Sequence, residues 1–243
     1  MLRPPFFDPA KTYYENWENG PFNDFADGVV LPLEESRFKY LGYKISYPIG
    51  IAAGPLLNSR FVKAALEKGF DVPVYKTVRT REKACNEWPN VLPVRVEGDL
   101  TLAQAAQGLV VKNGYTDPLA ITNSFGNPSY PVDVWQKDVR ELMQFARTRE
   151  GQIVCGMIEG TRWEPEASEA DFIADWVQAA KLMKACDVHA IEANFSCPNE
   201  GDRVKRLVCY DAELSGKIAQ AIKAEIGDLP LVIKISYFEH QEE

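Results

Sequence analysis

A cysteine flanked by asparagines stands where an apolar segment ends, at residues 191–199 with the sequence IEANFSCPN. Apolar and polar side chains alternate up to Phe195, which is the pattern of a β-strand. Pro198 cannot donate a backbone hydrogen bond to a sheet, so we expect the strand to stop before it. Amides, a hydroxyl and the Cys197 thiol are therefore delivered together at the carboxyl end of a strand, where parallel α/β folds hold their chemistry.

Two interpretations of Cys197 are open. An isolated cysteine is more often a small buried apolar residue than a nucleophile or a base. The flanking Asn194 and Asn199 favour a role as nucleophile or base, because buried amides without hydrogen-bond partners are costly and indicate a bound ligand. A ligand rich in carbonyl and N–H groups would satisfy both amides.

Other predicted strands also end in small or polar residues. A lysine within an apolar strand is unusual, because burial of an unpaired ammonium is expensive. Lys76 therefore lies either at a sheet edge in solvent or against a polar site, and Lys234 is a second lysine of this kind. The segment 123–129 (NSFGNPS) is either a turn or an amide-lined loop. The small residues at 52–55 either let a flat ligand approach the backbone or form a plain connection.

If these strands belong to one barrel, their carboxyl ends open at the same end of it. Two lysines, several asparagines and one cysteine would then meet there. This set of groups suits a flat, polar, carbonyl-rich ligand and a cysteine that acts as a general base. It suits a serine hydrolase or a metal enzyme poorly, because the chain has only two histidines and no cluster with metal-ligand spacing. Glu159 and Glu192 are too isolated in the sequence to assign, and we interpret His189 as structural.

The composition is that of a soluble globular protein: of 243 residues, 46% are hydrophobic and 26% are charged. A formal net charge of −8 argues against nucleic acid and anionic membranes as partners. No apolar run approaches the ~20 residues that span a bilayer, and the N-terminus lacks the apolar segment of a signal peptide. Five scattered cysteines without C-x-x-C spacing argue against a disulfide framework or a zinc site and favour the reducing cytoplasm.

Residues 1–36 show no sustained periodicity, and we expect an irregular extension that packs on a domain formed by residues 37–243. In that domain, residues 38–46 predict a hairpin with its turn near Leu41 and Gly42. Strands and helices then alternate, which predicts a parallel sheet. The expected strands are 48–53, 73–78, 119–124, 152–158, 189–195 and 230–236, and the expected helices are 59–69, 133–149, 169–186 and 212–226.

No GxGxxG motif follows the first strand and no GxxxxGK[ST] motif occurs, which argues against a Rossmann domain and a P-loop. We therefore predict an α/β fold of the (β/α)8 TIM-barrel type. Only about six of the eight strand–helix units are expected in this chain, which makes the predicted barrel incomplete.

Taken in order, these motifs resemble those of the dihydroorotate dehydrogenase family of flavin-dependent barrels. The resemblance covers about residues 38–236, and its most specific block is NFSCPN at 194–199. The cysteine in this block resembles the residue that the soluble branch of the family has there. The membrane-bound branch has serine at this position. The weaker motifs are YPIGIAAG at 47–54, KT at 76–77, NSFG at 123–126 and VIK at 232–234.

The resemblance implies an FMN-dependent oxidoreductase that oxidises dihydroorotate to orotate in pyrimidine biosynthesis, as a cytoplasmic homo-oligomer. It implies Cys197 as the catalytic base, a hydride passed to flavin N5, and a catalytic Lys76 that touches substrate and flavin. Lys234 would face the N1/O2 edge of the flavin. The implied substrate-binding residues are Asn123, Phe125, Gly126, Asn194 and Asn199, and the implied cofactor-binding residues are Ala53, Gly54, Lys76, Thr77, Asn194 and Lys234.

The sequence departs from the family pattern at several positions. Asn127 stands where the family usually has an apolar residue, and Ser129 stands near where it often has asparagine. The segment 200–206 does not resemble the glycine-proline loop of the soluble branch, and the glycine-rich FMN-phosphate loops do not occur before Glu243. Three alternatives therefore stay open: a dihydropyrimidine-dehydrogenase-like flavoenzyme, a truncated non-catalytic barrel remnant, and a Schiff-base aldolase that uses Lys234. We expect weak or no activity from the isolated chain.

Overall fold

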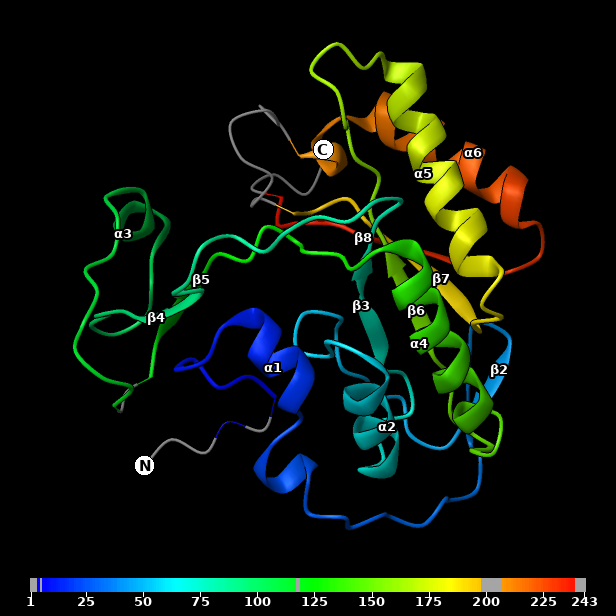
Figure 1. The fold of residues 1–243 in the computed structure, drawn as a ribbon, viewed down its shortest axis with the longest axis horizontal. Coiled ribbons are helices and arrows are strands. Elements are labelled where there is room, and N and C mark those ends of the chain that lie inside the picture. Colours follow the sequence, from blue (N-terminus) through cyan, green and yellow to red (C-terminus); the bar gives the residue numbers. More distant parts are fainter. Residues whose placement is uncertain (1–3, 5, 117–118, 198–206, 239–243) are drawn as a thin grey trace.

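A four-stranded parallel sheet organises the computed structural model, which describes residues 4, 6–116, 119–197 and 207–238 (Figure 1). Its strand order is β3-β6-β7-β8, and the register pairs Ile158 with Ala193 and Asn194 with Lys234. The carboxyl ends of all four strands therefore lie at one edge of the sheet. The strands are β3 (Val74–Val78), β6 (Cys155–Ile158), β7 (Ala190–Asn194) and β8 (Leu231–Lys234).

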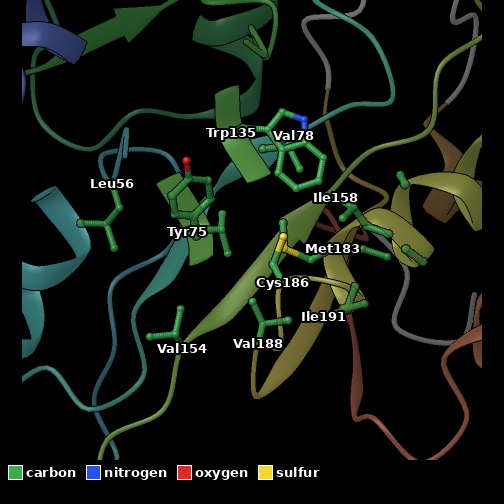
Figure 2. Close-up of a cluster of buried hydrophobic side chains, with 14 of the residues drawn as sticks. Leu56, Tyr75, Val78, Trp135, Val154, Ile158, Met183, Cys186, Val188 and Ile191 are labelled. Atoms are coloured by element: carbon green, nitrogen blue, oxygen red, sulfur yellow. The ribbon is translucent and has the colours of Figure 1, made fainter. Parts of the chain in front are cut away.

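Four amphipathic helices cover one face of this sheet. Three of them begin at a side-chain cap: the Asn58 side chain accepts from Arg60 at the start of α2, Ser168 and Asp171 form a capping box at the start of α5, and the Asp211 side chain accepts from Leu214 at the start of α6. The remaining helix, α4, follows Pro131 without such a cap. Their apolar sides meet the outward residues of the strands in one large core, part of which Figure 2 shows. The helices are α2 (Ser59–Glu67), α4 (Val132–Ala146), α5 (Glu169–Lys184) and α6 (Ala212–Ile226).

The opposite face of the sheet carries the alternate residues of the same strands. Near the amino ends these residues are apolar and pack into a second, smaller cluster, which contains Ile45, Ala53, Val74, Ile153, Cys155, Met157 and Ala190. Because side chains alternate along a strand, the residues that follow on this face include Lys76 and Asn194. The inner face thus changes from apolar to polar towards the carboxyl edge.

The fold class expected from the sequence, α/β with a parallel sheet, is confirmed, but one expected strand is placed wrongly. Residues 119–124 do not join the parallel sheet. Instead, β5 (Ile121–Asn123) pairs antiparallel with β4 (Val91–Pro93), in a ribbon that stands apart from the sheet together with α3 (Leu102–Ala106) (Figure 1). The apolar residues of this segment are exposed, Ile121 by 53%, so their hydrophobicity does not mark a core strand.

The first expected strand, 48–53, is not a regular strand of the structure, although it lies beside the segment that leads into β3. Its carbonyl groups accept hydrogen bonds from the start of β3, including one from Val74 N to Ile51 O at 2.9 Å. This segment and four strands are the parallel elements of the described residues, which do not form a closed barrel.

The N-terminal region is more ordered than its lack of periodicity suggests. It contains α1 (Tyr13–Asn19), which begins with a capping box between Thr12 and Glu15, and the short 3-10 helix η1 (Asn23–Phe25). Tyr13 belongs to the large core, so part of the extension packs on the domain as expected. A helix of only seven residues is too short to produce a clear periodic pattern.

The expected hairpin is confirmed: β1 (Phe38–Tyr40) pairs antiparallel with β2 (Tyr43–Ile45). Leu41 and Gly42, the two turn residues, both have positive φ, at 50° and 90°, as a two-residue hairpin turn requires. A second 3-10 helix, η2 (Val208–Tyr210), leads into α6.

Candidate active site

The carboxyl edge of the parallel sheet gathers polar groups from neighbouring strands. Lys76 lies near the end of β3, Glu159 directly follows β6, and Asn194 ends β7 beside Lys234 of β8. Cys197 follows three residues after Asn194. Ligands of open parallel sheets bind at this kind of edge, so we take these residues as the candidate active site.

Lys76 is buried, with only 6% of its surface exposed. Burial lowers the pKa of its ammonium group from 10.5 to about 8, although the negative charge of Glu159 acts in the opposite direction. The thiols of Cys197 and Cys85 also interact electrostatically with this group. The interpretation of Lys76 as a lysine in solvent is therefore wrong, and the one that places it against a polar site is supported.

Glu159 and Arg79 form a buried ion pair beside Lys76. Arg79 Nη2 donates to Glu159 Oε1 at 3.0 Å, and the two side chains are exposed by 0% and 5%. The other carboxylate oxygen, Oε2, accepts from Nδ2 of Asn127 and from Nδ2 of Asn194, the latter at 2.8 Å. One carboxylate thus links β3, β6, β7 and the loop that holds Asn127.

Glu159 could not be assigned from the sequence, and Arg79 was not singled out there. Each residue continues an apolar strand by one position, as Arg79 follows Val78 and Glu159 follows Ile158. A charged residue immediately after a buried strand, on each of two strands, was the available signal. The partners are 80 residues apart, so only the parallel pairing of β3 with β6 reveals that they meet.

Cys197 is half-buried at the end of the segment that follows β7. Asn194 is buried, and its amide oxygen accepts from the Ser196 hydroxyl at 3.3 Å. Phe195, between them, turns to the other side of the sheet and packs edge-on against Trp176 of α5. The apolar anchor of Phe195 fixes the direction of the polar residues on either side of it.

A dihydroorotate dehydrogenase from Dictyostelium discoideum is 34% identical to this chain over 258 residues, which include 99% of the chain. The chain belongs to the dihydroorotate dehydrogenase family. It spans 66% of the length of that relative. No family model matches the chain.

A solved dihydroorotate dehydrogenase from Eimeria tenella, in complex with ferulenol, shares the fold. Its TM-score is 0.56 at 17% identity, over 85% of this chain and 55% of that one. The incomplete parallel sheet is therefore comparable with part of a known dihydroorotate dehydrogenase fold. Among the described residues, no helix is both long enough and apolar enough to cross a membrane.

The remaining residues that the dihydroorotate dehydrogenase motifs point to fall into two groups. Lys234 is half-buried and interacts with Glu192, whose pKa is raised by burial despite this lysine. Thr77 and Ala53 are buried, and the Thr77 hydroxyl contacts the Met157 sulfur at 2.8 Å. Gly54 is exposed, and a side chain added there would meet nothing within 4 Å. These residues lie in or next to the parallel sheet.

The loop residues of the second group lie closer to the ribbon and to the N-terminal region. Asn123 is exposed at the end of β5, and Phe125 packs edge-on against Phe7, with 5.1 Å between ring centroids. Gly126 is buried with φ 70°, a backbone conformation that favours glycine, and an added Cβ would lie 2.6 Å from the Asn86 side chain. Asn199 lies outside the described residues. Substrate contacts by this group stay predictions.

The buried ammonium of Lys76 should make this dihydroorotate dehydrogenase family member less stable than it could be. Replacing Lys76 with methionine, which has similar volume, should raise the free energy of unfolding at pH 7 by roughly 3 kcal/mol, the equivalent of the lowered pKa. The unfolded lysine binds its proton more tightly than the folded one, so wild-type stability should rise relative to the variant between about pH 8 and 10.5. Urea unfolding across this pH range measures both effects.

Lys181→Met, at an exposed position of α5, is the matched control and should change stability little. A Lys76→Met protein that is less stable than the wild type at pH 7 would show that the attraction to Glu159 outweighs burial.

Proposed function

We propose that the protein is an FMN-dependent oxidoreductase that converts dihydroorotate to orotate, with Cys197 as the base. The observation that carries this proposal is the buried Lys76, whose ammonium interacts with the Cys197 thiol at the carboxyl edge of the sheet. A nearby positive charge favours a thiolate over a thiol, and a thiolate is the form that can accept a proton. At neutral pH, below its pKa of about 8, Lys76 carries this charge.

Oxidation of dihydroorotate to orotate removes one proton and one hydride from neighbouring ring carbons. Cys197 would take the proton, and bound FMN would supply the hydride acceptor. The positive charge of Lys76 would stabilise the Cys197 thiolate and attract the negatively charged substrate. The amides of Asn194 and Asn199, with Asn123 and the Phe125–Gly126 backbone, would hold the substrate.

The residues of the inner sheet face suit a flavin. The isoalloxazine ring is flat and rich in carbonyl oxygens, and the donors here are the ammonium groups of the two lysines. The open space above Gly54 and the small side chain of Ala53 leave room for a flat ring. We therefore propose that Ala53, Gly54, Lys76, Thr77, Asn194 and Lys234 hold FMN, with Lys234 opposite the ring edge that becomes negatively charged.

The cellular setting is part of the same proposal. The five cysteines, all among the described residues, form no disulfide in the structure, which is compatible with a reducing compartment. Together with the family membership, this supports a role in pyrimidine biosynthesis in the cytoplasm, and we propose a homo-oligomer.

Titration of the purified chain with FMN, followed by flavin absorbance and fluorescence, tests the proposal. We expect saturable binding and then bleaching of the flavin when dihydroorotate is added without oxygen. Dihydrouracil, which lacks the carboxylate, is the matched control substrate and separates a dihydropyrimidine-dehydrogenase-like activity from the proposed one.

Two results would contradict the proposed function. Bleaching by dihydrouracil but not by dihydroorotate would assign a different dihydropyrimidine substrate. Covalent trapping of a carbonyl substrate on Lys234 by borohydride, without flavin binding, would favour the aldolase alternative.

A further inference from the structure

One carboxylate controls the orientation of two amides in the candidate active site. Glu159 is 4% exposed, and both of its oxygens accept hydrogen bonds from buried or half-buried donors. Oε1 accepts from Arg79, and Oε2 accepts from the amide nitrogens of Asn127 and Asn194. An ionised carboxylate can only accept, so the nitrogen end of each amide has to face it. The oxygen end of each amide is thereby turned away from Glu159.

Asn127 is held in this arrangement from its backbone as well. Its φ of 44° is in the left-handed region, which asparagine tolerates better than most residues. Arg79 Nε donates to the Asn127 carbonyl at 3.1 Å while Nη2 of the same guanidinium binds Glu159. One rigid guanidinium thus fixes both the main chain of Asn127 and the carboxylate that orients its side chain.

We propose that Glu159 is a positioning residue that turns the Asn127 and Asn194 amide oxygens towards the substrate, so that the site selects a ring edge with N–H donors. This inference rests on the proposed function, because a dihydropyrimidine ring carries two such N–H groups. It also gives a physical reason for the asparagine at position 127, where the family pattern has an apolar residue. The amide at 127 and the carboxylate at 159 act as a pair.

Glu159→Gln in the intact protein tests the proposal with almost no change of shape. Arg79 should take the glutamine oxygen, which leaves an N–H group facing the two asparagines. Their amides would then turn round and present N–H groups to the N–H edge of the substrate. We expect the KM for dihydroorotate to rise about 10- to 100-fold, as for the loss of one well-made hydrogen bond.

Two controls separate orientation from general damage. Glu164→Gln removes an exposed carboxylate that pairs with Arg81 at 3.4 Å, and KM should stay as in the wild type. In an Asn127→Leu background, which has one amide fewer to turn, Glu159→Gln should raise KM less than in the wild type. An active enzyme whose KM is unchanged by Glu159→Gln, or changes equally in both backgrounds, would overturn the inference.

Side-chain amide NMR of the flavin-free protein keeps this test separate from the proposed function. Resonances of Asn127, assigned by their loss in Asn127→Leu, should shift in Glu159→Gln and stay in place in Glu164→Gln. Absence of that shift overturns the orienting role even if the enzyme is active. Absence of flavin reduction in the wild type overturns the proposed function, whatever the amide resonances show.

Discussion

Cys197→Ser in the intact protein should slow the reduction of bound flavin by dihydroorotate about 10²- to 10⁴-fold at neutral pH, the usual contribution of a general base. A serine hydroxyl is much harder to ionise than a thiol, and the ammonium of Lys76 stabilises a thiolate at this position. The residual rate should rise towards higher pH more steeply than in the wild type. Anaerobic stopped-flow absorbance of the flavin measures the step directly.

Cys85→Ser is the matched control for this substitution. Cys85 also interacts with Lys76, but burial raises the pKa of its thiol to about 11, so it stays protonated at neutral pH. Its replacement should leave flavin reduction nearly unchanged. If Cys85→Ser slowed reduction as much as Cys197→Ser, the base would have to be reassigned, and equal rates for wild type and Cys197→Ser would remove Cys197 from the mechanism.

The residues whose position in the fold could be predicted from the sequence are those whose neighbours in the chain define their setting. Asn194 and Cys197 stand at the end of a strand that alternation and Pro198 delimit, and Lys76 stands in an apolar strand where a charge is conspicuous. The register of the parallel strands then places Asn194 beside Lys234 without further assumptions. The local sequence pattern and the direction of the strands were enough to place these residues at the carboxyl edge of the sheet.

Glu159 could not be predicted because its importance depends on partners far away in the chain. Arg79 is 80 residues before it, Asn127 is 32 before it and Asn194 is 35 after it. Its place directly after a buried strand was the available local signal, but an exposed carboxylate at a strand end gives the same pattern. The departure at Asn127 was visible in the sequence, but its reason, the buried carboxylate, was not.

The misplaced strand at 119–124 has a similar cause. A short run of β-branched and apolar residues fits a ribbon on the surface as well as a strand in a parallel sheet, since both have the same local conformation. What separates them is burial: β3 is buried throughout, whereas all three residues of β5 are exposed. Helices, in contrast, carried a periodic apolar face and, for three of the four, a capping residue, and their expected bounds were nearly correct.

Replacing Arg79 with methionine should lower the free energy of unfolding by about 3–5 kcal/mol. The guanidinium is fully buried, and it binds Glu159, the Asn127 carbonyl and the Thr161 hydroxyl. Methionine fills much of the same volume but leaves the Glu159 charge buried without its cation. Removal of one member of a buried ion pair is destabilising for this reason, even where the pair itself adds little net stability. Urea unfolding at neutral pH measures the loss.

Arg81→Met provides the comparison within the same segment of chain. Arg81 lies two residues further on, its side chain is 61% exposed, and it pairs with Glu164 at 3.4 Å. An exposed pair of this kind contributes about 0–1 kcal/mol, so Arg81→Met should be nearly neutral. If the two variants unfolded at the same urea concentration, the Arg79–Glu159 pair would not hold the strand ends together.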